Sequence, residues 1–457
     1  MLNRIIQRFF GGSNADPKDV VEPVVIPRPD HPMSRKSVSK NALKVLYRLR
    51  DNGYEAYLVG GCIRDIVLGQ SPKDFDVATN ASPEEIKESF RNCRLIGRRF
   101  RLAHIVFGRE IIEVATFRGG HSEAGKRDAH TDEQGRILRD NVYGTLEEDV
   151  LRRDFTINAL YYNIEDFSIV DYVGGMPDLN DRVIRLLGDP ETRYREDAVR
   201  ALRAVRFAAK LDFEIDPATA EPLARVGEWL EQIPAARLFE EVLKLFQGGH
   251  AVRSMEELRR YDLLRYLFLS LDTRLKSADP LASELTALAL KNTDLRVAQN
   301  KPITPAFLYA ALLWPDIQQR AAEIGVQENL PPVPAIHAAA DEILAQQVRQ
   351  TALPKRFSVP AREIWTMQPR LEQYTGKRAL KSLEHPRFRA GYDLLVLRAK
   401  AGEPLQDTAD WWTEIQESPE VAEQMAMARQ KNAETRRAPR KRGGRRRRGP
   451  RRDQPQN

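Results

Sequence analysis

Cysteine is scarce in this sequence, which has two thiols, Cys62 and Cys93, among 457 residues. Two thiols cannot build a disulfide framework or a zinc site with four cysteine ligands. No apolar run is long enough to cross a bilayer, and residues 1–12 lack the apolar core and cleavage site of a secretory signal. The motifs GxGxxG and GxxxxGKS/T are also missing. These absences predict a cytoplasmic protein and exclude the two nucleotide folds that carry those motifs.

The two ends of the chain differ from the rest. Residues 2–10 place apolar side chains at helical spacing beside two arginines, which is compatible with a membrane-surface helix, although a frayed terminus is favoured. Residues 435–457 hold eleven Lys or Arg and one Asp, whereas the remaining chain has 61 basic and 64 acidic residues, a net charge of −3. The basic tail cannot build a core, so we expect disorder and binding to nucleic-acid phosphates, with a solubilising tag as the alternative.

The remaining composition, 42% hydrophobic and 30% charged, is typical of a globular protein, and this length predicts about two to four domains. Strand patterns dominate before Pro190 and amphipathic helical patterns follow it. The fold class is therefore α+β, a mixed-sheet head followed by an all-helical neck and body. The predicted boundaries are an N-terminal extension and linker, a head, a neck, a body and a disordered tail, at residues 1–36, 37–190, 191–250, 251–430 and 431–457.

Within the head, residues 37–53 and CIRDIVLG (62–69) predict helices. YEAYLVGG (54–61), DFDVAT (74–79) and the pair joined at Gly108 predict strands. We predict a helix for RDFTINALYYN (153–163), and two closing strands for IVDYV and VIRLLG.

Asp74 and Asp76 lie one residue apart in the predicted strand DFDVAT. Alternate strand residues share a face, so both carboxylates point the same way while Phe75 points into the core. Two carboxylates in this arrangement can hold divalent ions for in-line attack on phosphorus, and their oxygen ligands favour Mg²⁺ or Mn²⁺ over zinc. Asp-x-Asp alone is a weak signal, so its neighbours decide the interpretation.

A glycine turn precedes the two acids. Gly60 and Gly61 allow a ligand to approach the backbone, and their amides open a helix N-terminus, which favours anions. Arg64 follows one helical turn later and can reach the same phosphates, unless it forms a structural pair with Asp65. The turn predicts a phosphate site beside the carboxylates.

A third carboxylate would complete the site, and two candidates exist. Glu113 alternates with apolar residues in the strand EIIEVATFR, which predicts a strand beside DFDVAT. Asp154 lies in RRDFTINAL at a predicted helix start. Either residue can instead be a cap or an ion-pair partner. Both remain candidates, with a slight preference for Asp154.

Four ordered motifs then resemble one superfamily. GGCIRDIVLGQSPKDFDVATN, RRDFTINAL, DYVGGMPDLNDRVIRLLG and REDAVRALRAVRFAAKL are similar to the successive motifs of class II nucleotidyltransferases, over residues 54–250. This superfamily has a polymerase β-like head and includes CCA-adding enzymes and bacterial poly(A) polymerases. LIGRRFRLAHIVFG (95–108), LEHPRFRAGYDLLVLRA (383–399) and the Arg-rich end resemble the poly(A) polymerase branch.

The resemblance implies roles for individual residues. Asp74, Asp76 and Asp154 would be catalytic, with the metals on Asp74 and Asp76 and with Glu113 kept as a metal-ligand candidate. Gly60, Gly61, Arg64 and Arg153 would hold the triphosphate and ribose of ATP. The helix EDAVRALRAVRF would complete the nucleotide site with Asp197, Arg200, Arg203 and Arg206, and Arg237 with Glu241 would brace it.

An arginine stripe on an otherwise apolar helix indicates an internal cleft. Asp197 accepting from adenine N6 and Arg200 donating to N1 would read the Watson–Crick edge. Cytosine presents the same order at N4 and N3, so this pair alone cannot reject CTP. The strand with Arg98, Arg99, Arg101 and His104 either contributes to that selection or is a basic outer face.

The resemblance implies template-independent polyadenylation of RNA 3′ ends, which marks RNA for decay. The expected substrates are ATP and mRNA, regulatory RNA or tRNA precursors, and the expected partners are an RNA chaperone and the decay machinery, with a monomeric enzyme. CCA addition to tRNA is the alternative within the superfamily. An RNA-binding protein with an inactive head and a small-molecule nucleotidyltransferase are the alternatives outside it.

Overall fold

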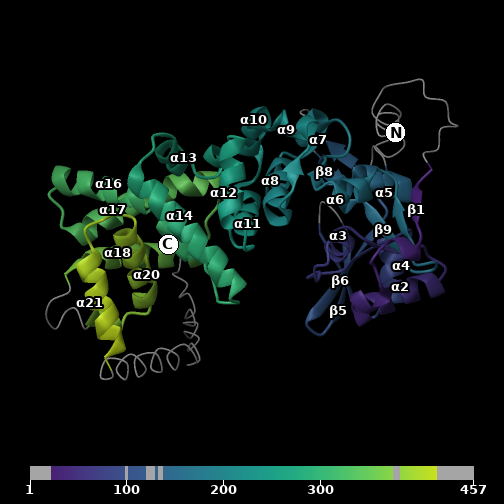
Figure 1. Ribbon diagram of the computed structural model, residues 1–457, viewed down its shortest axis with the longest axis horizontal. Helices are drawn as coiled ribbons and strands as arrows, with labels where there is room; N and C mark the ends of the chain where they lie inside the picture. The colour runs from purple at the N-terminus through teal and green to yellow at the C-terminus, as the bar shows by residue number, and fades with distance from the viewer. Residues whose placement is uncertain are drawn as a thin grey trace, which may run out of the picture.

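The computed structural model describes residues 22–97, 101–119, 129–131, 137–140, 142–373 and 381–418. A head containing the sheet lies at one end of the molecule and a group of helices at the other (Figure 1). Helices α8 (Val199–Leu211), α11 (Ala235–Phe246) and α12 (Ala251–Arg260) lie between them. This arrangement confirms the predicted α/β head and helical body. The predictions about residues 1–21, about Arg98 and Arg99, and about the basic tail fall outside the described residues.

An eight-stranded mixed sheet forms the head. In spatial order its strands are β1 (Val24–Ile26), β10 (Ile169–Asp171), β9 (Leu160–Asn163), β2 (Ala56–Val59), β3 (Asp76–Thr79), β6 (Glu110–Thr116), β5 (Leu102–Phe107) and β4 (Cys93–Ile96). Neighbours pair antiparallel except β3 and β6, which run parallel. Two short pairs lie outside this sheet, β7 (Ala129–Thr131) with β8 (Ile137–Asp140), and β11 (Val183–Ile184) with β12 (Glu214–Ile215).

The head helices are α2 (Lys40–Asp51), α3 (Gly61–Val67), α4 (Pro83–Ser89), α5 (Leu146–Arg152) and α6 (Gly175–Asn180). Helix α2 begins where the Ser39 hydroxyl caps the amide of Ala42, and its buried face packs toward β2, β3 and β6. Ser82 and Glu85 form a capping box that starts α4. These helices confirm the helix predictions for residues 37–53 and 62–69.

The segment predicted as a linker contributes the edge strand β1. Val24–Ile26 pairs with Ile169–Asp171, and Met33 is fully buried in the core shortly after it. The prolines that favoured a linker flank this strand, and an edge strand tolerates them because one of its sides needs no backbone partner. The ordered head therefore begins before residue 37.

The helix predicted for RDFTINALYYN is wrong. This segment forms a 3-10 turn, η4 (Thr156–Asn158), and then strand β9 between β10 and β2. Tyr161 and Tyr162 are both fully buried on opposite faces of the sheet, so the strand shows no polar alternation. Hydrogen bonding to β10 and β2 on either side therefore determined the conformation of this segment, and not its helix-like sequence pattern.

Two predicted strands shift their position. DFDVAT becomes a strand only at Asp76, so Asp74 lies just before β3. VIRLLG provides β11, which pairs with β12 in a separate sheet and does not close the main one. IVDYV forms β10 of the main sheet as predicted.

Beyond Pro190 the described chain is almost entirely helical. Besides α8, α11 and α12, the helices are α7 (Pro190–Glu196), α9 (Pro217–Ala220), α10 (Leu223–Val226), α13 (Leu269–Lys276), α14 (Pro280–Ala298), α15 (Pro305–Leu312), α16 (Trp314–Gln327), α17 (Pro332–Gln350), α18 (Lys355–Glu372), α20 (Phe388–Lys400) and α21 (Gln406–Glu417). The sequence predicts that the tryptophans of this part pack the core, and Trp314, Trp365 and Trp412 are buried there, while Trp411 is partly buried. Among the described helices, none is both long and apolar enough to cross a membrane.

Candidate active site

A glycine turn joins β2 to α3 at the centre of the sheet. Gly60 has φ 78° and ψ −131°, a conformation that residues with a Cβ rarely adopt. Its amide donates to the carbonyl of Leu160 at 3.3 Å, which ties the turn to β9. The turn places Gly60, Gly61 and the first residues of α3 beside the start of β3, because Val59 and Asp76 are register partners.

Asp76 lies on β3 at the level of Glu113 on the parallel strand β6. Burial, the charge of Glu113 and the charge of Asp74 together raise the pKa of Asp76 to about 6, against the opposing effect of Arg153. Asp74 itself is exposed, and Phe75 between the two acids is buried, as predicted. Three carboxylates thus share one electrostatic environment.

Such crowding fits a divalent cation. Among the described residues, no three His, Cys, Asp or Glu side chains form a complete ligand cluster. Mg²⁺ in nucleotide enzymes is held by one or two carboxylates together with substrate phosphates, so an incomplete set is appropriate. The all-oxygen donors also suit a hard cation, and bound positive charge would offset the repulsion that raises the pKa of Asp76.

Glu113 also contacts the neighbouring strand. Its Oε1 lies 3.1 Å from His104 Nε2, across the β5–β6 register pair that these residues form. His104 therefore belongs to the site side of the sheet and not to a separate basic face. Arg101 forms an ion pair with Glu84 at 2.7 Å.

Asp154 has a different environment from the other acids. Its Oδ2 accepts from Arg203 at 2.5 and 2.7 Å, and its Oδ1 accepts from Asn158 and from the amide of Phe155. Burial opposes ionisation, but the charge of Arg203 and these hydrogen bonds outweigh it and hold the pKa of Asp154 well below its usual range. These contacts tie Asp154 in the head to Arg203 on α8.

Two predicted phosphate-binding arginines flank the glycine turn. Arg64 pairs with Asp65 at 2.7 Å, donates to Asn158 at 2.5 Å and is buried, so the structural pair is formed. A Cβ on Gly61 would lie 3.4 Å from its Nη2, so the guanidinium borders the turn. Arg153 is held by Asp149 at 2.8 Å, while its Nη1 lies 3.7 Å from the Cβ position of Gly60.

The predicted base-reading residues lie at the junction of α7 and α8. Asp197 precedes α8, and both of its oxygens accept from Arg237 on α11, at 2.9 and 2.6 Å. Arg200 Nη1 donates to Glu196 at 2.7 Å and to the carbonyl of Arg193 at 2.6 Å. Arg237 and Glu241, which were predicted to brace this helix, both contact it from α11: Arg237 holds Asp197 just before α8, and Glu241 contacts Arg206 on α8.

Arg206 and Arg203 complete the arginine stripe on α8. Arg206 lies 3.5 Å from Glu241, and its side chain is 14% exposed against 31% for Arg203. Burial and the nearby charge of Arg203 lower the pKa of Arg206 to about 10. The stripe is therefore internal, as the pattern indicated.

Sequence reasoning missed the residues that hold Arg153 and its backbone in place. Asp149 and the Tyr161 hydroxyl fix Arg153, and Arg193 donates to the carbonyls of Arg152 and Arg153 at 3.0 and 2.6 Å. Burial, with the charge of Arg200, lowers the pKa of Arg193 to about 9. The i,i+4 spacing of Asp149 and Arg153 was a sequence signal, whereas the contacts of Tyr161 and Arg193 depend on tertiary packing.

Three family models match successive parts of the chain. The poly A polymerase head domain matches residues 56–185, which include the glycine turn and all four acids. The probable RNA and SrmB-binding site of polymerase A matches residues 212–275. The arginine-rich C-terminus of polymerase A matches residues 328–452.

Known proteins match to different extents. Poly(A) polymerase I of Salmonella typhimurium is 52% identical over 399 residues, which are 86% of this chain and 86% of that protein. A CCA-adding enzyme of Lactobacillus helveticus is 38% identical over 215 residues, 47% of this chain and 52% of that protein. The crystal structure of the Bacillus stearothermophilus CCA-adding enzyme with CTP shares 27% identity and a TM-score of 0.55, covering 84% of this chain and 82% of that one.

Proposed function

This chain belongs to the bacterial poly(A) polymerase I family, and on that premise we propose which of its residues carry the reaction. It is a polynucleotide adenylyltransferase, which transfers AMP from ATP to RNA 3′ ends and releases pyrophosphate. CCA addition is not favoured, because the CCA-adding relative matches 47% of this chain against 86% for the polymerase relative.

Use of ATP in this family implies a divalent cation, and Mg²⁺ or Mn²⁺ is our specific proposal. Asp74, Asp76 and Glu113 would hold it. The chemistry such a cation supplies is a lowered pKa for the RNA 3′-hydroxyl and neutralisation of charge on the triphosphate. The raised pKa of Asp76 beside Glu113 is the observation that carries this assignment. Glu113 replaces Asp154 as the preferred third carboxylate, because Asp154 is committed to Arg203.

The cationic side chains would orient the triphosphate for in-line attack. Arg153 presents Nη1 beside Gly60 while Asp149 and Tyr161 fix its other nitrogens. Arg64 borders Gly61 but is held by Asp65 and Asn158, so its role is to shape the turn and contribute charge. Fixed donors need no reorganisation when charge develops, which is the basis of electrostatic catalysis.

The junction of α7 and α8 would read adenine. Asp197 would accept from N6 and Arg200 would donate to N1, while Arg203 and Arg206 would line the pocket behind them. Arg237 holds the carboxylate plane of Asp197, which limits the shapes of base that fit. Cytosine offers the same donor and acceptor, but its N4 and N3 lie closer to the ribose than N6 and N1 of adenine. With the ribose and triphosphate held at the glycine turn, a fixed Asp197 would therefore be within reach of adenine and not of cytosine, which gives a physical reason for rejecting CTP.

Further proposals follow from the family. We propose a cytoplasmic monomer that marks mRNA, regulatory RNA and tRNA precursors for decay with an RNA chaperone and the decay machinery. Membrane contact through residues 1–12 stays a prediction. For the domains, we propose a head that begins near β1, with the neck at 191–250, the body at 251–430 and the basic tail at 431–457 retaining RNA between additions.

One incorporation assay tests the function and its carboxylates. The full chain is given each nucleoside triphosphate separately, with a generic RNA 3′ end and with tRNA lacking CCA. We expect AMP addition to both RNAs and negligible CMP addition. Asp76→Asn should lose at least about 99% of the rate, whereas the exposed control Asp181→Asn should retain it. Full activity of Asp76→Asn, or CMP addition restricted to tRNA, would refute the proposal.

A further inference from the structure

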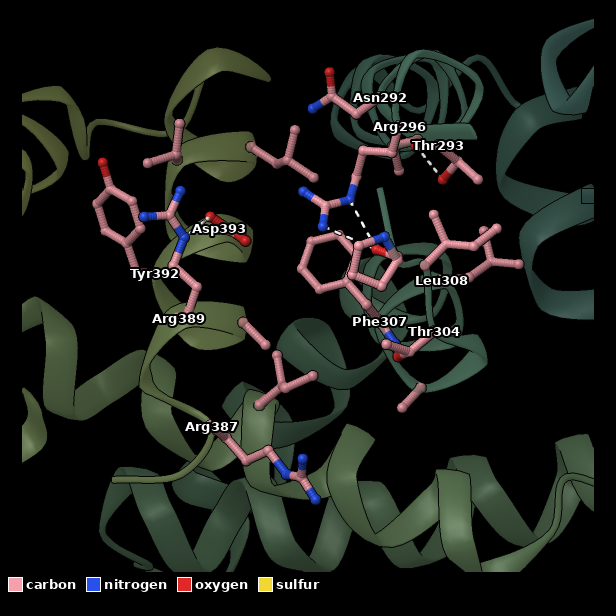
Figure 2. Close-up of a pocket in the computed structure, with 18 of the residues that line it drawn as sticks. Asn292, Thr293, Arg296, Thr304, Phe307, Leu308, Arg387, Arg389, Tyr392 and Asp393 are labelled. Carbon is pink, nitrogen blue, oxygen red and sulfur yellow. Dashed lines mark hydrogen bonds and ion pairs between the residues drawn. The ribbon is translucent and has the colours of Figure 1, made fainter. Parts of the chain in front are cut away.

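A pocket of about 620 Å³ lies in the helical body (Figure 2). None of the described residues that line it belongs to the head. It is formed by α14, α15, α18 and α20, together with the loop that joins α14 to α15. Its apolar surface includes Ile303, Phe307, Leu308, Ile364 and Val396. A large aromatic side chain among aliphatic neighbours provides a surface on which a planar base can stack.

The polar lining of this pocket is strongly cationic. Arg296, Arg387, Arg389 and Lys400 contribute four positive charges, and Asp393 is the one acidic residue among the described lining. Arg389 lies 3.0 Å from Asp393, and Arg387 is 2.8 Å from Glu363 outside the pocket. Lys400 is exposed, and no partner is found for it within the described part of the chain. The excess of positive charge in the lining favours an anionic ligand and disfavours the chain's own Arg-rich tail.

Two of these side chains offer a complementary donor and acceptor. Arg296 is held by the carbonyl of Pro302, which accepts from Nε at 3.1 Å and from Nη2 at 2.8 Å. Figure 2 shows its guanidinium extending toward Asp393, which lies on α20 at the opposite side of the pocket. Burial raises the pKa of Asp393, and the charges of Arg389 and Arg296 oppose that rise. A carboxylate facing a guanidinium can bind an amino group next to a ring nitrogen, a pattern that adenine shares with cytosine.

A third observation points to a missing acceptor. Gln247 lines the pocket at the end of α11, and its Nε2 is buried without a hydrogen-bond partner among the described residues. Leaving a buried donor unpaired is destabilising, and a ligand oxygen or nitrogen would relieve that cost. Along α11, Gln247 lies roughly 15 Å from Arg237, the residue that holds the base reader Asp197. The pocket is therefore separate from the nucleotide site but connected to it by one rigid helix.

We propose that this pocket binds one adenosine nucleotide of the growing tail, upstream of the 3′ end that reacts. The base stacks on Phe307 with its amino group on Asp393 and a ring nitrogen on Arg296, and the phosphates lie along Lys400 and Arg389. This assignment rests on the proposed function, since the tail is its product. Each new adenosine would reach the pocket as the RNA moves, which favours continued addition to RNAs that already end in A.

Binding of modified oligoadenylates to the full chain, without ATP, tests the proposal. In a series of oligo(A) strands of about 15 residues, purine riboside, which lacks the 6-amino group, replaces adenosine at one position at a time. We expect a window of about one or two positions, upstream of the terminal nucleotide, where the replacement weakens binding at least about threefold. Equal affinity at every position would overturn the proposal.

Reversing the charge of Lys400, which lines the pocket, provides a second test of the proposal. Lys400→Glu should weaken binding of unmodified oligo(A) at least about fivefold and reduce the slope of log K against log salt by about 0.7 for each phosphate that residue 400 no longer neutralises. Arg349→Glu is the matched control, because Arg349 is an exposed cation of the body outside the pocket, and it should change affinity less than about twofold. Equal effects of the two variants, with unchanged thermal melting, would show that net charge alone is responsible and overturn the site. AMP incorporation by the same wild-type preparation tests the proposed function separately.

Discussion

Arg237 on α11 donates to both carboxylate oxygens of Asp197, at 2.9 and 2.6 Å, and so fixes the residue that would accept from adenine. Bidentate arginine–carboxylate pairs orient the planes of both groups, which a single hydrogen bond cannot do. In the proposed role, Asp197 would be oriented before ATP arrives, so that little ordering would remain to be done on binding.

Replacing Arg237 with Gln should allow the carboxylate of Asp197 to rotate. We expect the KM for ATP to rise roughly 10–150-fold, since charge-assisted hydrogen bonds contribute roughly 1.5–3 kcal/mol, and the preference for ATP over CTP to fall. Steady-state kinetics with each nucleotide measures both effects. Arg225→Gln, which removes a neck arginine whose side chain is 59% exposed, serves as the control. An unchanged preference would mean that selectivity resides elsewhere.

The two candidates for the third carboxylate predict different kinetics. Glu113→Gln should lower kcat about 100-fold or more and raise the Mg²⁺ concentration needed for half-maximal rate, because Glu113 shares the environment of Asp76. Asp154→Asn should mainly raise the KM for ATP, because it releases Arg203. A metal titration of both variants separates these outcomes. The opposite pattern would restore Asp154 as the metal ligand.

The Asp154–Arg203 ion pair should make stability depend on pH. The pKa of Asp154 is lowered in the folded protein, so its contribution is fully present above the ordinary carboxyl pKa and is lost as the pH falls through the lowered value. At pH 7, Asp154→Asn should cost about 2–4 kcal/mol, less than for a wholly buried pair because Arg203 keeps 31% exposure. Urea unfolding at about pH 7 and about pH 2.5 should show this difference shrinking in acid. A constant difference would contradict the assignment.

The conformation of Gly60 can be tested by giving it a side chain. A Cβ there would find its nearest neighbours, Arg153 Nη1 and the carbonyl of Asn158, at 3.7 Å, so no clash is expected. Gly60→Ala should nevertheless lose about 1–3 kcal/mol of stability through backbone strain at φ 78°. Thermal melting of this variant beside Gly61→Ala, whose φ is not positive, isolates the strain. Equal melting temperatures would show that the turn relaxes.

Sequence patterns correctly predicted those parts of the head whose structure depends on residues only a few positions apart. The Gly60 turn, helix α3 and the hairpin at Gly108 all appear as expected, because turn residues and caps act within a few positions. Strand β9 was predicted as a helix because its burial on both faces removes alternation. Strand β1 was assigned to a linker because three residues are too few to produce a pattern.

The candidate site followed the same division. Motifs proposed Asp74, Asp76 and the arginines of α8 as site residues, but they could not predict which ion pairs these residues form. Which acid meets Arg203, and which meets Arg237, depends on how α8 and α11 approach the head. Because tertiary packing determines these pairs, the sequence alone could not show whether Glu113 or Asp154 is the third carboxylate.

Helix α8 forms two ion pairs with other elements: Arg203 with Asp154 of the head, and Arg206 with Glu241 of α11. A truncation at residue 190 would therefore leave Asp154 without its counter-ion, although the main sheet would be intact. A fragment that keeps the Asp154–Arg203, Asp197–Arg237 and Arg206–Glu241 contacts has to extend through α11, which ends at Phe246.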